Sequence, residues 1–192
     1  MLPAAEAAFT QVVAAAEIKE RVAELGAAIN DDYRDSEPIL VAVLVGALPF
    51  LADLARQLTV ATKIDFLSIS RFGEGGRIRI ILDVADNLLG KDVVVIEDIV
   101  DTGLSLTVLR RMLLDRGANS VATVALLDKT TRRLVDVPLE YRGFEVGDEY
   151  LIGYGLDFEG NFRNLPALWA VLDADFASRD PAGSARYLYQ HR

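Results

Sequence analysis

The sequence contains no cysteine and a single histidine, His191, which stands next to the last of its 192 residues. The missing thiols exclude disulfides, thiolate metal sites and a cysteine nucleophile. A histidine so near the chain end is a poor candidate for a catalytic or metal-binding residue. No stretch is long and apolar enough to cross a membrane, and the first residues lack the basic start of a signal peptide. We therefore expect a cytoplasmic protein that has no membrane partner.

Positive charge is also scarce. Lysine and arginine together number 20, whereas aspartate and glutamate number 29, so the formal net charge at pH 7 is −9. This balance argues against a nucleic-acid partner, since such proteins need a basic surface. It does not exclude a small molecule that carries phosphate, because such a ligand needs only local donors. Hydrophobic residues make up 52% of the chain, enough for the core of one domain of this length.

The most informative stretch begins with four β-branched residues, Val93 to Ile96, which predict a strand buried on both faces of a parallel sheet. Three acids follow within five residues: Glu97, Asp98 and Asp101. One acid at the end of a strand would usually be a solvated turn residue. Three of them at the carboxyl end of a buried strand favour a ligand site, because open α/β sheets bind their ligands at this edge.

The residues after these acids predict a turn and then a helix. Thr102, Gly103 and Ser105 lead into a helical pattern from Leu106 to Leu114. A helix start offers backbone N–H groups and the positive end of the helix dipole, which suit a phosphate. Gly103 would allow a close approach of the backbone, and the hydroxyls would add donors. Because like charges repel, we expect the carboxylates to serve sugar hydroxyls, a cation or a proton.

The segment Glu-Asp-Ile-Val-Asp-Thr-Gly at residues 97–103 resembles the phosphoribosyl-diphosphate (PRPP) signature of type I phosphoribosyltransferases, in the form of the hypoxanthine/guanine branch. Further segments match the family in the same order, and the resemblance covers roughly residues 36–172. It implies an α/β fold, an open and mostly parallel sheet flanked by helices, with a small hood. The alternation of predicted strands and helices over residues 38–128 favours the same class.

The resemblance implies a single phosphoribosyltransferase domain, residues 1–192. Its core would span about residues 36–146, and its hood would combine an N-terminal helix with about residues 147–172. Helical spacing of apolar residues over residues 4–29 predicts one long helix or two short ones. Residues 173–192 are polar, and we expect them to form a disordered tail.

The resemblance also assigns the PRPP site. Its members would be Val45, Gly46, Glu97, Asp98, Asp101, Thr102, Gly103, Leu104, Ser105 and Arg163. The turn at residues 101–105 would hold the 5′-phosphate, Glu97 and Asp98 would hold the ribose hydroxyls, and Asp101 would be the catalytic base for the N7 proton of the purine. The pyrophosphate would meet Arg163 and the backbone at Val45-Gly46. The family often has Leu-Lys-Gly at that turn, and here Val45 stands in place of the lysine.

A purine site and a magnesium site follow from the same resemblance. The purine-binding positions would be Lys129, Tyr150, Leu151 and Asp157, and the positions that hold Mg²⁺ would be Glu97, Asp98 and Asp157. Lys129 would donate to the 6-oxo group, Tyr150 would stack on the base, and the backbone of Leu151 would read its edge. An amino group in place of the 6-oxo group would set donor against donor, so we expect adenine to be a poor substrate.

One segment departs from the family pattern. Residues 70–76 predict the tip of a glycine-rich hairpin, where the family carries its active-site lid with a Ser-Tyr pair. This chain has Arg71-Phe72 there and a shorter loop. Because a lid excludes water and completes a site, the changed lid and Val45 keep a second function open, a sensor or regulator that binds PRPP or nucleotide with little turnover. The intact base, purine and metal positions count against it.

The implied activity is that of a purine-salvage transferase. It would transfer the 5-phosphoribosyl group of PRPP to a 6-oxopurine, hypoxanthine or guanine, and release pyrophosphate. A nicotinamide-dinucleotide enzyme is excluded, since no Gly-x-Gly-x-x-Gly follows an early strand. By analogy with the family we expect a homodimer or homotetramer. The preference among hypoxanthine, guanine and xanthine stays open.

Overall fold

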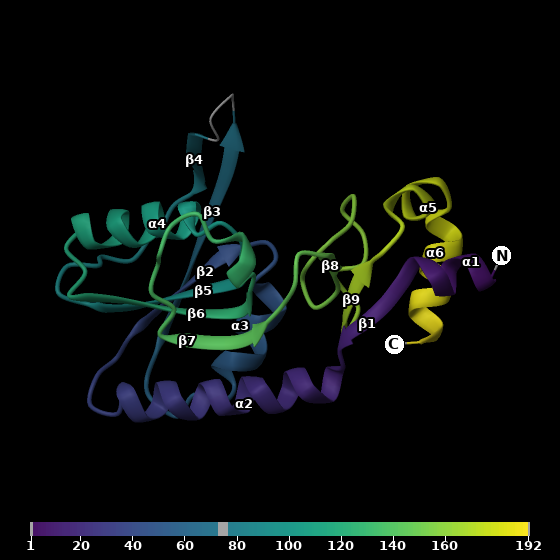
Figure 1. Cartoon of the computed structure of the whole chain (residues 1–192). Coiled ribbons are helices and arrows are strands. Elements are labelled where there is room, and N and C mark those ends of the chain that lie inside the picture. Colours follow the sequence, from purple (N-terminus) through teal and green to yellow (C-terminus); the bar gives the residue numbers. More distant parts are fainter. Residues whose placement is uncertain (1, 73–76, 192) are drawn as a thin grey trace. The chain divides into compact units, whose positions relative to one another are not determined.

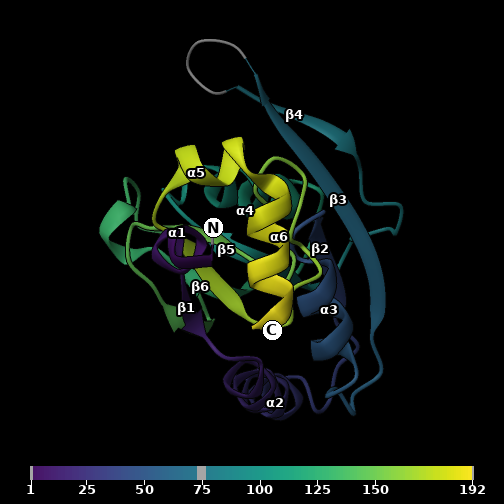
Figure 2. The same cartoon turned by 90° about the vertical axis from the view of Figure 1, so that its right-hand side faces the viewer.

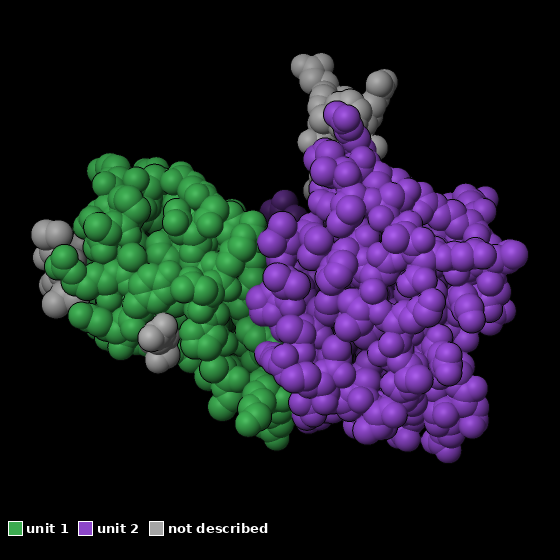
Figure 3. Space-filling model, turned by 180° about the vertical axis from the view of Figure 1, so that it is seen from behind, with its two compact units in different colours: residues 1–21, 148–192 green, residues 22–147 purple. Residues whose placement is uncertain are grey.

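The computed structural model of the chain describes residues 2–72 and 77–191. The chain divides into two compact units, residues 22–147 and residues 1–21 with 148–192, which are purple and green in Figure 3. That both units belong to a single domain stays a prediction. None of the described helices has the length and hydropathy that crossing a membrane requires.

A six-stranded sheet forms the larger unit (Figure 1). In spatial order its strands are β4 (Arg77–Leu82), β3 (Lys63–Phe72), β2 (Ile39–Leu44), β5 (Asp92–Val100), β6 (Ser120–Asp128) and β7 (Tyr141–Glu145). All neighbouring strands are parallel except β3 and β4, which form an antiparallel hairpin. The predicted α/β class with an open, mostly parallel sheet is confirmed.

Strand β5 lies inside this sheet and is buried on both of its faces, as its run of β-branched residues predicts. Successive residues of Val93–Ile96 point to opposite faces, and none is more than 1% exposed. On one face, the odd-numbered pair packs with leucines of α4 (Leu104–Asp115). Figure 1 shows α3 (Leu48–Ala55) and residues 22–32 of α2 (Ala15–Asp32) on the other face. The carboxyl end of β5 is therefore held rigidly by sheet and helices.

The β3–β4 hairpin stands where the lid is predicted. Strand β3 continues to Phe72, so residues 70–72 belong to this strand and not to the predicted tip. The tip, residues 73–76, and the side chains of Arg71 and Phe72 lie outside what the structure describes. The role of this hairpin as a lid stays a prediction.

The smaller unit has its own sheet and its own core. Three antiparallel strands lie in the order β1 (Phe9–Val13), β9 (Leu168–Val171) and β8 (Tyr150–Ile152). The unit also contains α1 (Leu2–Ala8), α5 (Ala174–Arg179) and α6 (Pro181–Gln190), which Figure 2 shows from the side of the chain ends. The core contains buried residues of all three strands and of α5 and α6, among them Phe9, Ile152, Phe162, Trp169, Val171, Ala177 and Leu188.

Of the predicted alternatives for residues 4–29, one long helix or two short ones, the structure has two helices, but the strand β1 between them was not predicted. The backbone of Phe9–Val13 pairs with β9, and its two end residues are buried while the middle three are exposed. Thr10, Val12 and Val13 are β-branched and suit a strand. The alanines on both sides gave the whole stretch a helical appearance.

The prediction of a disordered tail is wrong. Residues 174–190 form α5 and α6, and each helix begins with an aspartate whose side chain accepts a backbone N–H. Asp173 accepts from Phe176 and Asp180 accepts from Gly183, both over 2.8 Å. Leu188 is fully buried. Capping and burial together order a stretch whose average composition is polar.

Candidate active site

Glu97 and Asp98 lie on the strand itself, and Asp101 directly follows its last residue, Val100. β5 continues to Val100, because Glu97 to Val100 stay in register with Ala125 to Asp128 of β6. Neighbouring residues of a strand point to opposite faces, so Glu97 and Asp98 have different surroundings. Glu97 is only 7% exposed and lines a cavity. Asp98 lies on the side of the turn that follows β2.

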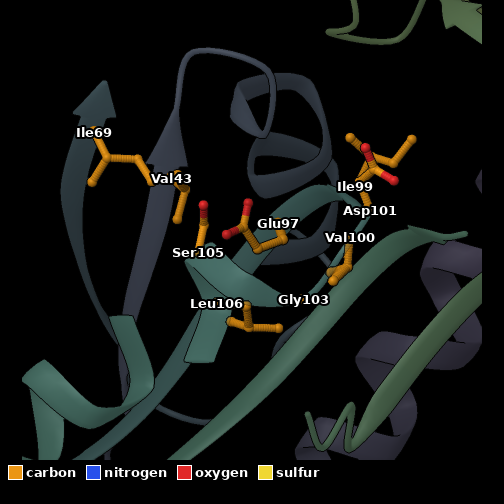
Figure 4. Close-up of a pocket in the computed structure, with 9 residues that line it drawn as sticks. All are labelled: Val43, Ile69, Glu97, Ile99, Val100, Asp101, Gly103, Ser105 and Leu106. Atoms are coloured by element: carbon orange, nitrogen blue, oxygen red, sulfur yellow. The ribbon is translucent and has the colours of Figure 1, made fainter. Parts of the chain in front are cut away.

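The cavity beside Glu97 has a volume of about 290 Å³. Its lining comes from β2, β3, β5 and the start of α4: Val43, Ile69, Glu97, Ile99, Val100, Asp101, Gly103, Ser105 and Leu106. Figure 4 shows the carboxylate of Glu97 and the hydroxyl of Ser105 directed toward the same space. Four predicted PRPP-binding residues thus share one concave surface, with apolar walls around a few polar groups.

The 101–105 turn depends on a glycine. Gly103 precedes α4 with φ at +82°, in the left-handed region. A Cβ atom at this position would lie 3.0 Å from the carbonyl oxygen of Val135 and 3.1 Å from Cγ1 of Val137. The carbonyl of Gly103 accepts from both the backbone and the hydroxyl of Thr107. Gly103 has no side chain that could cap the first N–H groups of α4, so the start of the helix suits an anion.

The residues after β6 fasten this turn. Arg132, in the 3₁₀ helix η1 (Thr130–Arg132), donates from Nε to Asp101 Oδ1 over 2.7 Å. Arg133 donates to the carbonyl of Asp101 over 3.3 Å, and the N–H of Leu134 donates to the carbonyl of Thr102 over 3.0 Å. The predicted base is therefore held by an arginine pair that sequence reasoning missed. The two adjacent arginines close behind Lys129 were the available signal.

Lys129 is buried, at 8% exposed, directly after β6. A lysine at a strand end is usually solvated, so this burial favours a specific role. Its neighbour Asp128, only 1% exposed, forms ion pairs with Arg133 over 2.5 Å and with Arg142 over 2.8 Å. These pairs compensate a buried charge and fix the backbone that leads into Lys129.

The turn after β2 lies against Asp98. A Cβ atom on Gly46 would come within 1.5 Å of Asp98 Oδ2, so a larger residue would fit there only if the Asp98 side chain moved. The peptide bond between Leu44 and Val45 is cis, and the side chain of Val45 is 55% exposed. Val45 and Gly46 do not line the cavity described above. Their predicted contact with pyrophosphate stays a prediction.

A second cluster of predicted residues lies in the smaller unit, on the 150–164 segment. Asp157 pairs with Arg163 over 2.5 Å and accepts the N–H of Gly160 over 2.7 Å. The hydroxyl of Tyr150 donates to the carbonyl of Asp157 over 2.9 Å. Burial, followed by the Asp157 carboxylate, raises the pKa of Tyr150. Arg163 also donates to the carbonyl of Gly155.

The predicted purine contacts in this segment differ in exposure. Tyr150 is 53% exposed, and the edge of its ring meets Phe158 with centroids 5.5 Å apart. An exposed aromatic face suits stacking with a base. Leu151 is buried, as expected where only its backbone is to contact a ligand.

Within the described residues, no group of three or more acidic or histidine side chains is placed to hold a metal ion. Glu97 and Asp98 belong to the larger unit and Asp157 to the smaller one, so their joint role as metal ligands stays a prediction. Carboxylate oxygens still suit Mg²⁺, which commonly binds through one or two carboxylates and the phosphates of a substrate. A single carboxylate meets that smaller requirement, and Glu97, which lines the cavity, is placed to supply it.

Comparisons with known proteins agree with one another. The phosphoribosyl transferase domain family matches residues 9–159. The hypoxanthine phosphoribosyltransferase of Salmonella typhimurium is 42% identical over 166 residues, which cover 83% of this chain and 93% of that protein. The hypoxanthine-guanine phosphoribosyltransferase of Bacillus subtilis is 39% identical, with coverage of 84% and 92%. A crystal structure of a hypoxanthine phosphoribosyltransferase from Staphylococcus aureus aligns with a TM-score of 0.84 and 33% identity, over 88% of this chain and 94% of that one.

Proposed function

Because the chain belongs to the phosphoribosyl transferase family, we propose that it transfers the 5-phosphoribosyl group of PRPP to hypoxanthine or guanine and releases pyrophosphate. The curated relatives are hypoxanthine and hypoxanthine-guanine phosphoribosyltransferases. The observation that carries the proposal is the cavity where a buried Glu97, Asp101, Gly103 and Ser105 meet the start of α4. No comparison favours the sensor that the changed lid kept open.

The 5′-phosphate binds at the 101–105 turn in this proposal. The left-handed Gly103 turns the backbone toward the first turn of α4, whose N–H groups and dipole attract a dianion. The Ser105 side chain lines the same cavity and can add a hydroxyl donor. Glu97 and Asp98, which phosphate would repel, bind the ribose hydroxyls instead.

Transfer breaks the bond between C1′ and the pyrophosphate oxygen and forms a bond from C1′ to the purine. Positive charge develops at the ribose ring on the way, so carboxylates near the ring stabilise the transition state. Asp101 accepts the N7 proton of the purine as a general base. Its ion pair with Arg132 must open first, and this costs little because both side chains are partly exposed.

Mg²⁺ belongs to the proposal as the ion that neutralises the leaving pyrophosphate. Glu97, which lines the cavity, would hold it together with oxygens of PRPP, and Asp98 remains a predicted second ligand. Asp157 remains a predicted third ligand. It forms an ion pair with Arg163 in this structure, so this role would require Asp157 to share its carboxylate.

In this proposal, Lys129 and Tyr150 recognise the purine base. Lys129 donates to the 6-oxo group, and its burial strengthens discrimination because an unmatched donor there cannot turn to water. Tyr150 stacks on the base through its exposed ring. A cytoplasmic location and a homodimer or homotetramer remain predictions.

The decisive assay follows nucleotide formation by absorbance with PRPP, Mg²⁺ and each of hypoxanthine, guanine, xanthine and adenine. We expect product from hypoxanthine or guanine, little from adenine, and none after chelation of the metal. Binding of PRPP by calorimetry without product from any base would contradict the proposal and would restore the sensor.

A further inference from the structure

Polar and aromatic side chains of helices α5 and α6 contact the 150–164 segment. The hydroxyl of Ser178, in α5, donates to Glu159 Oε1 over 3.1 Å. The hydroxyl of Tyr189, in α6, donates to Asn164 Oδ1 over 2.8 Å. The Tyr189 ring also lies near that of Phe162, with centroids 6.4 Å apart. These contacts reach the turn after Asp157 and the residues on both sides of Arg163.

The backbone of this segment requires support from its surroundings. Phe158 and Asn161 pair through two backbone hydrogen bonds across a tight turn, in which Glu159 and Gly160 have φ at +50° and +83°. Phe162 has φ at +71°, although it is a bulky residue and is buried. Such residues rarely adopt this conformation, and it persists only where neighbouring structure enforces it.

The two helices are themselves firmly held. Leu188 and Ser184 of α6 are fully buried, and Ala177 of α5 is 2% exposed. The ring of Tyr187 lies against Phe9 of β1 and Trp169 of β9, with centroids 6.3 and 6.2 Å apart. Because the helices are anchored on the sheet of their unit, their side chains offer the segment fixed points of contact.

We propose that α5 and α6 brace the 150–164 segment, and that Tyr189 is a positioning residue that holds Arg163 ready for the pyrophosphate of PRPP. The inference rests on the proposed function. It gives residues 174–190, whose average composition indicates only a tail, a part in binding PRPP. Tyr189 acts through Asn164 and Phe162, which flank Arg163. Loss of this support should loosen PRPP binding more than it slows transfer.

The test is Tyr189→Phe, which removes one hydroxyl and keeps the ring against Phe162. Loss of one hydrogen bond corresponds to about a threefold to tenfold change. We expect the Kd of PRPP by calorimetry and its KM to rise by this factor, with kcat nearly unchanged. Amide hydrogen exchange at Gly160 and Asn161 should become faster. Tyr187→Phe is the matched control, since its hydroxyl makes no hydrogen bond within the described residues, and it should behave as the wild type.

A second substitution separates bracing from a general loss of stability. Asn164→Ala should weaken PRPP binding as much as Tyr189→Phe, and the double variant should be no weaker than either single variant, because both remove the same bond. Wild-type PRPP affinity and exchange in Tyr189→Phe would overturn the brace, as would additive effects or an equal loss in Tyr187→Phe. A wild-type protein that forms no nucleotide would refute the proposed function instead, and the exchange comparison would still test the brace.

Discussion

The 101–105 turn and the 150–164 segment are held in different ways. The turn depends above all on its backbone, although Arg132 and Arg133 also fasten it. Gly103 adopts a left-handed conformation where a Cβ would come within 3.0 Å of a neighbouring carbonyl oxygen. The segment depends on side chains, above all the Asp157–Arg163 ion pair and the hydrogen bond from Tyr189 to Asn164. A substitution that the backbone conformation cannot accept displaces the whole turn. A substitution in a network of side chains removes one contact and leaves the others in place. We therefore expect large effects from changes in the turn and moderate ones in the segment.

The largest effect is expected from Asp101→Asn. The amide keeps the shape of the turn and can still meet Arg132, but it cannot take the N7 proton. A general base contributes about 10²- to 10⁴-fold, so kcat should fall by that factor while the Kd of PRPP changes little. Steady-state kinetics with hypoxanthine and calorimetry with PRPP measure the two quantities. Turnover near that of the wild type would refute the role of Asp101 as base.

Gly103→Ala tests the backbone directly. The new Cβ would press on Val135 and Val137 and would strain a left-handed residue. A displaced turn should weaken PRPP binding about tenfold to a hundredfold, and strain should lower the free energy of unfolding by about 1–3 kcal/mol. Calorimetry and thermal unfolding measure these two changes.

Gly90→Ala is the matched control for this substitution. Gly90 also has positive φ, at +68°, but a Cβ there would meet nothing within 4 Å. The control should lose stability from backbone strain and keep its PRPP affinity. If Gly103→Ala binds PRPP as tightly as Gly90→Ala does, PRPP binding does not depend on the backbone conformation of the 101–105 turn, and the proposed difference between the turn and the 150–164 segment is wrong.

The sequence is sufficient to predict β5 and the turn, because their determinants are local. Four adjacent β-branched residues, Val93–Ile96, indicate a buried strand, and a glycine between a strand and a helix indicates a tight turn. The same local pattern did not show that β5 continues through Glu97 and Asp98, since only pairing with β6 extends it. It also did not show Arg132 beside Asp101, because these residues are 31 positions apart.

The smaller unit was harder to predict for the same physical reason. Phe9–Val13 becomes a strand by pairing with Leu168–Val171, at the other end of the chain. Residues 174–190 become ordered because their few apolar side chains are buried in the core of that unit. Average polarity does not report where those few residues lie. The contacts from α5 and α6 that hold the 150–164 segment could therefore not be predicted from the sequence.

Lys129→Gln should change specificity more than rate. Lys129 follows β6 and is buried, so its donor has a fixed place. Glutamine offers both a donor and an acceptor, and the preference for hypoxanthine over adenine, measured as the ratio of kcat/KM values, should fall about tenfold. The exposed Lys91→Gln is the control and should leave the ratio unchanged. An unchanged ratio in Lys129→Gln would mean that Lys129 does not read the 6-oxo group.

The smallest effect is expected from Tyr150→Phe, which keeps the ring for stacking and removes the donor to the carbonyl of Asp157. The KM of the purine should rise about twofold to fivefold. Tyr150→Leu, which also removes the ring, should raise it further. If the two variants are equal, Tyr150 does not stack on the base. If the rise in purine KM in either variant is larger, as a factor, than the rise in the Kd of PRPP in Gly103→Ala, the 150–164 segment does not tolerate substitution better than the turn does.

The effect of Tyr150→Phe on the purine KM depends on pH only through ionisation of the Tyr150 hydroxyl. Burial first, and then the Asp157 carboxylate, raise the pKa of Tyr150 above its ordinary value of 10.0. A raised pKa keeps the hydroxyl protonated over a wider range, so its hydrogen bond is present below pH 10 and is lost only as the pH rises through the raised pKa. The ratio of purine KM between Tyr150→Phe and the wild type should therefore stay constant from about pH 6 to about pH 9. A ratio that fell toward one within that range would show that the hydroxyl ionises early, which would contradict the raised pKa.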